Sequence, residues 1–307
     1  MSRLVLGAGP VGLLAAYLLR VPCVGEIFGG SVLLRRLAPS YLWESLALGR
    51  VLEDLGLSSE VEEVRFGFWT DSGVTSDPTP LERREYLRRS GRDPSRAPRS
   101  AVSSGTPGVL RCFRTSVEEL TRALERALTV RSELLRARVT SIAPWILQRR
   151  VDVELDGVSK LPVSEVVNTL PAPVFDSLTP AKLERTWDAG PKWFLGAARA
   201  WADPVRDAAS AGLRYLYVSN PRVPFDRVTF LPEGEGFVYE FNRDPAEVLA
   251  PGFCEDVFDT NFVGPLRLQV RGEPRSEVEY AGLVRHVGRF ARWDHRIRLH
   301  DVAGVLS

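Results

Sequence analysis

The first residues of the chain alternate between short apolar runs and a glycine-rich turn. Residues 3–6 are almost wholly apolar and predict a strand, and residues 13–20 carry apolar side chains at helical spacing. Between them lies the sequence Gly-Ala-Gly-Pro-Val-Gly, residues 7–12. Strand, glycine turn and helix in this order form the context in which G-x-G-x-x-G indicates a dinucleotide-binding turn. The opening of the chain therefore predicts the first βα unit of a Rossmann-like domain.

Each position of this turn has a physical role in that prediction. Gly7 permits the tight turn, Gly9 lets the backbone approach a pyrophosphate, and Gly12 lets the helix pack closely on the strand. Pro10 and Val11 begin the helix, whose N–H groups and positive dipole end favour a phosphate. A chance glycine turn is the alternative interpretation.

A second strand is expected at residues 21–26. The acid that binds ribose hydroxyls in such domains follows the first glycine by about 20 residues, and Glu26 fits this spacing. Gly29 and Gly30 follow it after only Ile27 and Phe28. The alternative for Glu26 is an ordinary solvated acid of a loop.

The rest of the chain also alternates between helical and strand-like patterns. A helix is predicted from Ser40 to Leu57, and a second one opens at Ser116, where Glu119 completes a capping box. A final basic helix is predicted from Ala291 to Val305. Strands are predicted at residues 137–142, 151–155, 163–170, 192–200, 213–219, 227–231 and 236–241, and the last four favour an antiparallel sheet.

Charge is almost balanced overall but uneven along the chain. The 307 residues carry 40 Lys and Arg against 39 Asp and Glu, which excludes a globally basic DNA-binding protein. Only three of the basic residues are Lys, a bias that codon usage explains in large part. Residues 77–99 carry a local charge of +3 and residues 285–300 one of +4. Two basic segments on a neutral protein predict an anionic or nucleotide-like substrate, DNA included; solvated surface is the alternative.

Cysteine usage and the apolar N-terminus bear on the compartment. Cys23, Cys112 and Cys254 are odd in number and far apart, which argues against a disulfide scaffold or a metal site and favours a reducing compartment. Residues 4–19 are uncharged, but this run is too short for a membrane span and is interrupted by glycines and a proline. We therefore expect a cytoplasmic protein with no membrane partner and no metal.

Four motifs together resemble a known superfamily. They are the glycine turn at 7–12, the acid followed by a glycine pair, VVNTLPAPVF at 166–175 and GRFARWDHRIRLHDV at 288–302. This combination resembles FAD-dependent oxidoreductases of the glutathione-reductase-like superfamily, and most closely their amine-oxidase and UDP-galactopyranose-mutase branch. The resemblance implies an α/β fold, in which a Rossmann-like FAD-binding domain contains an inserted, mainly antiparallel β substrate domain.

The resemblance also implies a division of the chain and a set of cofactor contacts. The FAD-binding domain would comprise residues 1–75, 110–175 and 276–307, with a mobile lid at 76–109 and the substrate domain at 176–275. The residues that would hold FAD are Gly7, Gly9, Pro10, Val11, Gly12, Glu26, Gly29, Gly30, Val139, Gly288, Arg289 and Trp293.

Candidates for catalysis are few, because a flavin itself accepts the hydride. In the resemblance, Lys192 would hold a water beside the flavin, and His295 would carry a proton or stack on the ring. A surface lysine and a helix-capping histidine are the alternatives. Arg227 is expected at the substrate pocket, whose floor would carry Tyr215, Tyr217 and Tyr239.

The function expected from the resemblance is oxidation or cleavage of a C–N bond in an amine. As a small, arginine-rich chain with these motifs, the protein also resembles phage-encoded flavoenzymes of thymidine hypermodification. That resemblance implies an amino-acid-substituted thymidine in DNA as the substrate, an aminomethyl group as the product and the host cytoplasm as the location. Two alternatives stay open. One is a flavin-dependent nucleotide-sugar mutase, and the other is a non-catalytic Rossmann protein that binds nucleotide or DNA.

Overall fold

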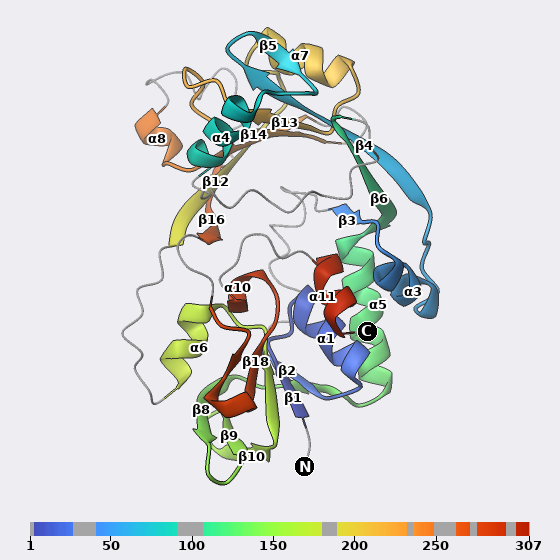
Figure 1. The fold of residues 1–307 in the computed structure, drawn as a ribbon, viewed down its shortest axis with the longest axis vertical. Coiled ribbons are helices and arrows are strands. Elements are labelled where there is room, and N and C mark those ends of the chain that lie inside the picture. The colour runs from blue at the N-terminus through green and yellow to red at the C-terminus, as the bar shows by residue number, and fades with distance from the viewer. Residues whose placement is uncertain are drawn as a thin grey trace.

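The computed structural model describes most of the chain. The described residues are 3–26, 41–90, 107–179, 189–231, 236–248, 262–270, 275–292 and 299–306. Of residues 189–192, 246, 262–270 and 289–290 only the backbone is described. Figure 1 shows an α/β half at the bottom and a larger sheet that arches over it at the top.

A six-stranded sheet forms the centre of the α/β half, in the order β17-β18-β11-β1-β2-β7. Its pairs are parallel except at the edge, where β17 runs antiparallel to β18. The strands are β1 (Arg3–Leu6), β2 (Cys23–Gly25), β7 (Leu134–Arg136), β11 (Glu165–Asn168), β17 (Val278–Glu279) and β18 (Val284–His286).

Both faces of this sheet are covered, which is why β1 is apolar at successive positions. On one face, Val5 and Cys23 are buried against α1 (Pro10–Leu19), α5 (Val117–Val130) and α11 (Leu299–Leu306). On the other face, Leu4 and Leu6 pack with residues of a three-stranded antiparallel sheet and of α6 (Ala172–Leu178). That small sheet comprises β8 (Val139–Trp145), β9 (Arg150–Leu155) and β10 (Ser159–Val163).

The upper sheet has nine strands in the order β16-β12-β15-β14-β13-β4-β6-β3, with β5 paired to β4. The four strands expected to form an antiparallel sheet do so, through the pairs β12–β15, β15–β14 and β14–β13, whereas β13 and β4 are parallel. The strands are β3 (Tyr41–Trp43), β4 (Val61–Thr70), β5 (Gly73–Thr75), β6 (Val109–Ser116), β12 (Ala189–Ala197), β13 (Tyr215–Val218), β14 (Arg227–Phe230), β15 (Phe237–Phe241) and β16 (Phe262–Val270).

The mixed α/β architecture agrees with the expected fold class. The upper sheet, however, takes β3, β4 and β6 from segments that the sequence analysis assigned to the FAD-binding domain. Strands expected in the FAD-binding domain and strands expected in the substrate domain thus belong to the same sheet. The domain boundaries themselves stay a prediction.

One predicted helix is wrong at its start. The helix expected from Ser40 to Leu57 is strand β3 followed by the shorter helix α3 (Leu46–Asp54). The Ser45 hydroxyl accepts a hydrogen bond from the Leu48 amide at 3.2 Å and so caps α3 at its true start. The aromatic residues before this cap pair with β6 instead. By contrast, the capping box of Ser116 and Glu119 at the start of α5 is confirmed.

The segment expected as a lid contains an ordered helix, α4 (Pro80–Arg89). It begins with a capping box of Thr79 and Glu82, and Tyr86 and Leu87 are buried against Phe68 of the upper sheet. Residues 91–106 lie outside the described part, so the motion of the segment stays a prediction.

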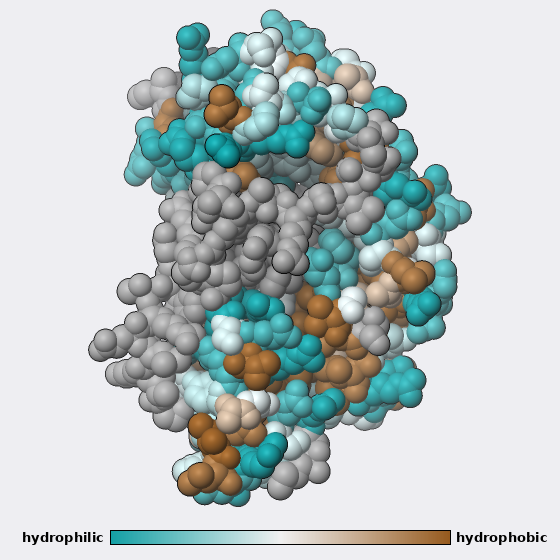
Figure 2. Space-filling view, viewed as in Figure 1, coloured by the Kyte–Doolittle hydropathy of each residue, from teal (hydrophilic) through white to brown (hydrophobic). Residues whose placement is uncertain are grey.

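The predicted C-terminal helix corresponds to two described helices, α10 (Arg289–Arg292) and α11, with residues 293–298 between them outside the described part. The remaining short helices are α7 (Asp203–Ser210), α8 (Pro245–Val248) and a 3₁₀ turn at Tyr280–Gly282. No helix in the described ranges is long and apolar enough to cross a membrane. Figure 2 shows apolar residues gathered at the lower end of the molecule, over β8–β10.

Candidate functional site

The glycine turn between β1 and α1 is constrained at two positions and open at the third. Gly7 has φ +98°, and a Cβ there would lie 2.8 Å from Thr169 Oγ1. A Cβ on Gly12 would lie 1.7 Å from the Gly7 carbonyl oxygen. A Cβ on Gly9, by contrast, would meet no atom of the described residues within 4 Å. The turn therefore packs tightly against the sheet while leaving space beside its middle glycine.

This space lies at the positive end of α1. Gly9 is the N-cap residue, Pro10 occupies the first turn, and neither a side-chain cap nor an acidic residue is present there. The first N–H groups of a helix have no partner within the helix, and the dipole of α1 favours a negative group at this end. The arrangement can bind an anionic group such as a phosphate.

The C-terminal motif reaches the same place. Gly288 has φ +90°, and a Cβ on it would lie 2.7 Å from Val11 Cγ1 in the first turn of α1. Thr169, at the end of β11, donates from its hydroxyl to the Leu6 carbonyl at 2.7 Å and lies 3.1 Å from the Gly7 carbonyl. The structure thus brings together residues from three of the four sequence motifs.

The end of β2 also lies against the glycine turn, since a Cβ on Gly25 would lie 2.7 Å from that of Ala8. Glu26 follows directly and is exposed. Because it is exposed beside the turn, Glu26 is available to a ligand bound there.

Val139, another predicted contact, begins β8 and is half-buried in the core below the sheet.

Several predicted site residues cannot be placed relative to this turn. Gly29, Gly30, Trp293 and His295 lie outside the described residues. The backbone of Lys192 pairs with Arg267 across β12 and β16, and Arg289 begins α10, but neither side chain is described. Their roles stay predictions.

Arg227 lies on the face of the upper sheet that we call the inner face, which carries Tyr215, Tyr217, Arg227 and Glu240. Arg227 forms a two-nitrogen ion pair with Glu240, and the two side chains are 17% and 2% exposed. Burial by itself lowers the pKa of Arg227, because it disfavours the charged guanidinium. The Glu240 carboxylate stabilises that charge more strongly, so the pKa of Arg227 lies above its usual value. The charge of Arg227 is thus already compensated within the protein.

Aromatic rings surround this ion pair. The Arg227 guanidinium lies 5.2 Å from the centre of the Tyr215 ring, and burial raises the pKa of Tyr215. Tyr215 contacts Tyr41 edge-on at 5.5 Å and stacks on Tyr217 at 6.2 Å. Tyr217 in turn lies 4.9 Å from Tyr86 of α4. The inner face is therefore largely aromatic.

The expectation that Tyr239 belongs to the same floor is wrong. Side chains alternate along a strand, so Tyr239 faces away from its neighbour Glu240. Tyr239 is fully buried in the core on the outer face, and its hydroxyl accepts a hydrogen bond from the Trp201 amide at 2.8 Å. Glu240, which the sequence analysis did not select, is the residue that meets Arg227.

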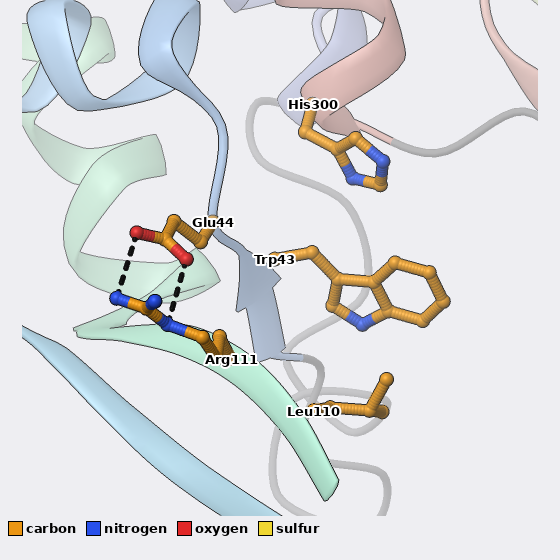
Figure 3. Close-up of a pocket in the computed structure, with 5 residues that line it drawn as sticks. All are labelled: Trp43, Glu44, Leu110, Arg111 and His300. Carbon is orange, nitrogen blue, oxygen red and sulfur yellow. Dashed lines mark hydrogen bonds and ion pairs between the residues drawn. The ribbon is translucent and has the colours of Figure 1, made fainter. Parts of the chain in front are cut away.

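A small pocket lies where the inner face meets the α/β half (Figure 3). Its lining residues are Trp43, Glu44, Leu110, Arg111 and His300. The indole of Trp43 stacks on the His300 imidazole with 5.3 Å between ring centres, which joins β3 to α11. Glu44 and Arg111 form a two-point ion pair at 2.9 and 3.1 Å. No sequence motif had pointed to Trp43.

The basic segments are partly neutralised. In α4, Arg83 pairs with Asp77, Arg88 pairs with Glu85, and Arg89 donates to backbone carbonyls. Near the C-terminus, Arg285 and Arg292 both pair with Glu277. Among the described residues, no group of His, Cys, Asp and Glu could hold a metal ion.

The fold is similar to that of several solved enzymes. UDP-galactopyranose mutase in its reduced form has a TM-score of 0.63 at 12% identity, over 98% of this chain and 92% of that chain. Cyclohexylamine oxidase from Brevibacterium oxydans IH-35A has a TM-score of 0.62 at 11% identity, over 99% and 98%. Putrescine oxidase bound to putrescine has a TM-score of 0.57 at 12% identity, over 99% of this chain and 98% of that chain.

At these identities the likeness shows a shared fold. No family model matches the chain, and no curated protein matches it in sequence.

Proposed function

We propose that the protein is an FAD-dependent oxidoreductase that oxidises an amine at a C–N bond. The observation that carries the proposal is the glycine turn, where Gly9 leaves open space at the N-terminus of α1. Gly12 and Gly288 allow close contact with Gly7 and Val11 of the same turn. Two of the proteins that share the fold are oxidases named for amines.

The residues present fit the cofactor. The N–H groups of α1 beside Gly9 would bind the pyrophosphate, and the exposed carboxylate of Glu26 would accept hydrogen bonds from the ribose. When bound, FAD would supply the acceptor for a hydride from the substrate. The remaining proposed contacts are Gly29, Gly30, Val139, Arg289 and Trp293.

The inner face of the upper sheet supports an amine with an apolar part as substrate. Tyr215 is buried but Tyr217 is only half-buried, and aromatic faces attract cations and apolar groups alike. Because Glu240 already compensates Arg227, we assign Arg227 to orienting Tyr215 and not to binding a phosphate. Lys192 is proposed to hold a water, and His295 to carry a proton.

An anionic or nucleotide-like substrate belongs to the same proposal at a finer level. The finest version is an amino-acid-substituted thymidine in phage DNA, which would yield an aminomethyl group. The sequence motivates it through its basic segments. Incubation of the flavin-loaded protein with aminated nucleosides and, separately, with DNA that contains them would decide between free and polymeric substrates by product mass.

A variant at the open position of the turn tests the cofactor. Gly9→Leu should fold, because a Cβ at this position meets no atom of the described residues within 4 Å, but the longer side chain should occupy the cofactor space. We expect the purified variant to lose the flavin absorbance near 450 nm and at least about 100-fold in FAD affinity. Gly304→Leu on α11, where a Cβ likewise has no described atom within 4 Å, is the matched control and should retain flavin.

If the wild-type protein neither carries nor takes up FAD, the proposal fails. Flavin retention by Gly9→Leu would instead show that the cofactor lies elsewhere.

A second candidate is a flavin-dependent mutase of a nucleotide sugar, favoured by the likeness to UDP-galactopyranose mutase. A mutase makes no net redox change, so reduction of the bound flavin by an amine without oxygen would exclude it. DNA binding without flavin, with a steep dependence on salt, would favour the non-catalytic alternative.

A further inference from the structure

The end of β8 and the turn that follows it expose three consecutive apolar side chains. Trp145, Ile146 and Leu147 are 46%, 51% and 94% exposed. Turns usually carry polar residues, glycine or proline, and a run of three exposed apolar residues is unfavourable in a water-soluble fold unless it has a function. We call residues 145–149 the apolar tip.

The apolar tip is held by a rigid support. Behind it, Ile142, Val151 and Val153 are fully buried in the core of the α/β half. The strands keep their antiparallel register up to the pair of Trp145 and Arg150. In Figure 2, apolar residues gather at the end of the molecule that these strands form. The tip is thus presented outward from a fixed base.

The other turn of the same small sheet provides a comparison. Between β9 and β10, Asp156 accepts a hydrogen bond from the Arg138 amide at 2.8 Å, and Gly157 has φ +71°. A single apolar residue, Val158, is exposed there, at 86%. The run of three at the apolar tip is therefore not a general property of this sheet.

One positive charge adjoins the apolar residues. Arg149 is exposed, has φ 49°, and its side chain forms no hydrogen bond or ion pair with the described protein. The neighbouring Arg150 is paired with Asp152 at 3.2 Å. The tip thus combines an apolar end with one uncompensated cation.

We propose that the apolar tip inserts into the headgroup region of an anionic lipid bilayer. Tryptophan favours the interface between water and hydrocarbon, the aliphatic side chains leave water on insertion, and Arg149 would meet anionic headgroups. A stable protein partner would need roughly 800 Å² and 20–30 residues on each side, far more than three apolar residues offer. The expectation of no membrane partner rested on the lack of a spanning segment, and surface insertion needs none.

Sedimentation of the full-length protein with lipid vesicles tests this inference independently of the flavin. We expect binding to phosphatidylcholine vesicles that contain 25% phosphatidylglycerol, and weaker binding to pure phosphatidylcholine. The triple variant Trp145→Ser, Ile146→Ser, Leu147→Ser should bind at least about 30-fold more weakly. Arg149→Gln should lose about fivefold on anionic vesicles alone.

Val158→Ser is the matched control and should bind like the wild type. All variants change exposed residues, so their thermal unfolding midpoints should match that of the wild type; Leu147→Ser alone serves if the triple variant unfolds. Absence of vesicle binding, or equal binding by the triple variant, would overturn the inference. So would a concentration-dependent dimer that the triple variant abolishes, because the tip would then contact a second copy.

Discussion

The glycine turn of the α/β half and the inner face of the upper sheet are built from opposite parts of the chain, the backbone in one and side chains in the other. At the turn, the backbone forms the site, and Gly7 and Gly12 are needed because any side chain would collide with neighbouring atoms. At the inner face, side chains form the site, and Arg227 and Glu240 satisfy each other from neighbouring strands. The turn is sensitive to added atoms, and the inner face is sensitive to removed ones.

The largest effect is expected from Glu240→Ala. This change leaves the Arg227 guanidinium largely buried without its carboxylate, which should cost about 3–5 kcal/mol of unfolding free energy. The double variant Arg227→Met, Glu240→Leu should recover most of that loss, because an apolar pair has no charge to desolvate. Urea unfolding measures both. A cost under about 1 kcal/mol for Glu240→Ala would mean that water solvates Arg227.

A somewhat smaller effect is expected from Gly12→Ala. The added Cβ would lie 1.7 Å from the Gly7 carbonyl oxygen, so α1 must move away from the turn, at a cost of about 2–3 kcal/mol. Gly304→Ala, in open space on α11, should instead stabilise by about 0.5–1 kcal/mol. Equal effects of the two substitutions would contradict the close packing of the turn.

The smallest effect concerns His286, which is fully buried at the end of β18 and lies 3.0 Å from Asn168. Burial lowers the pKa of His286, with a further contribution from Arg275, while Glu279 and Asp176 oppose the shift. The neutral imidazole therefore stabilises the fold above the unfolded-state pKa of about 6.5. This contribution is lost as the pH falls through that value towards the lower folded-state pKa.

When the pH falls from 7.5 to 5.5, the free energy of unfolding should therefore decrease less in His286→Gln than in the wild type. Thermal unfolding at both pH values, with wild type and variant measured side by side, checks this. A steeper loss in the variant would show that the folded protein favours the protonated histidine.

The two regions also differ in what the sequence could predict. The glycine turn is encoded within six residues, because its function depends on the absence of side chains at fixed spacing. The same holds for the capping box of Ser116 and Glu119, whose partners are three residues apart. Such local signals predicted β1, α1 and α5.

The inner face depends on pairing between distant strands. Arg227 meets Glu240 because β14 and β15 adopt one particular register, and no local pattern fixes that register. For the same reason Tyr239 was assigned to the wrong face. Strand β4 escaped prediction because Glu62, Glu63 and Arg65 interrupt its apolar pattern. Trp43 was assigned to a helix, although its place is set by pairing with β6.

The parallel pairing of β4 with β13 has a consequence for how the chain reaches its fold. Residues 66–69 cannot form this pairing until residues 215–218 have been synthesised, much later in translation. In the lower sheet, β11 likewise waits for β18 at residues 284–286. Contacts of such long range slow folding, since much chain must be ordered before they form. We expect the nascent chain to depend on its last strands, with both sheets closing late in one cooperative step.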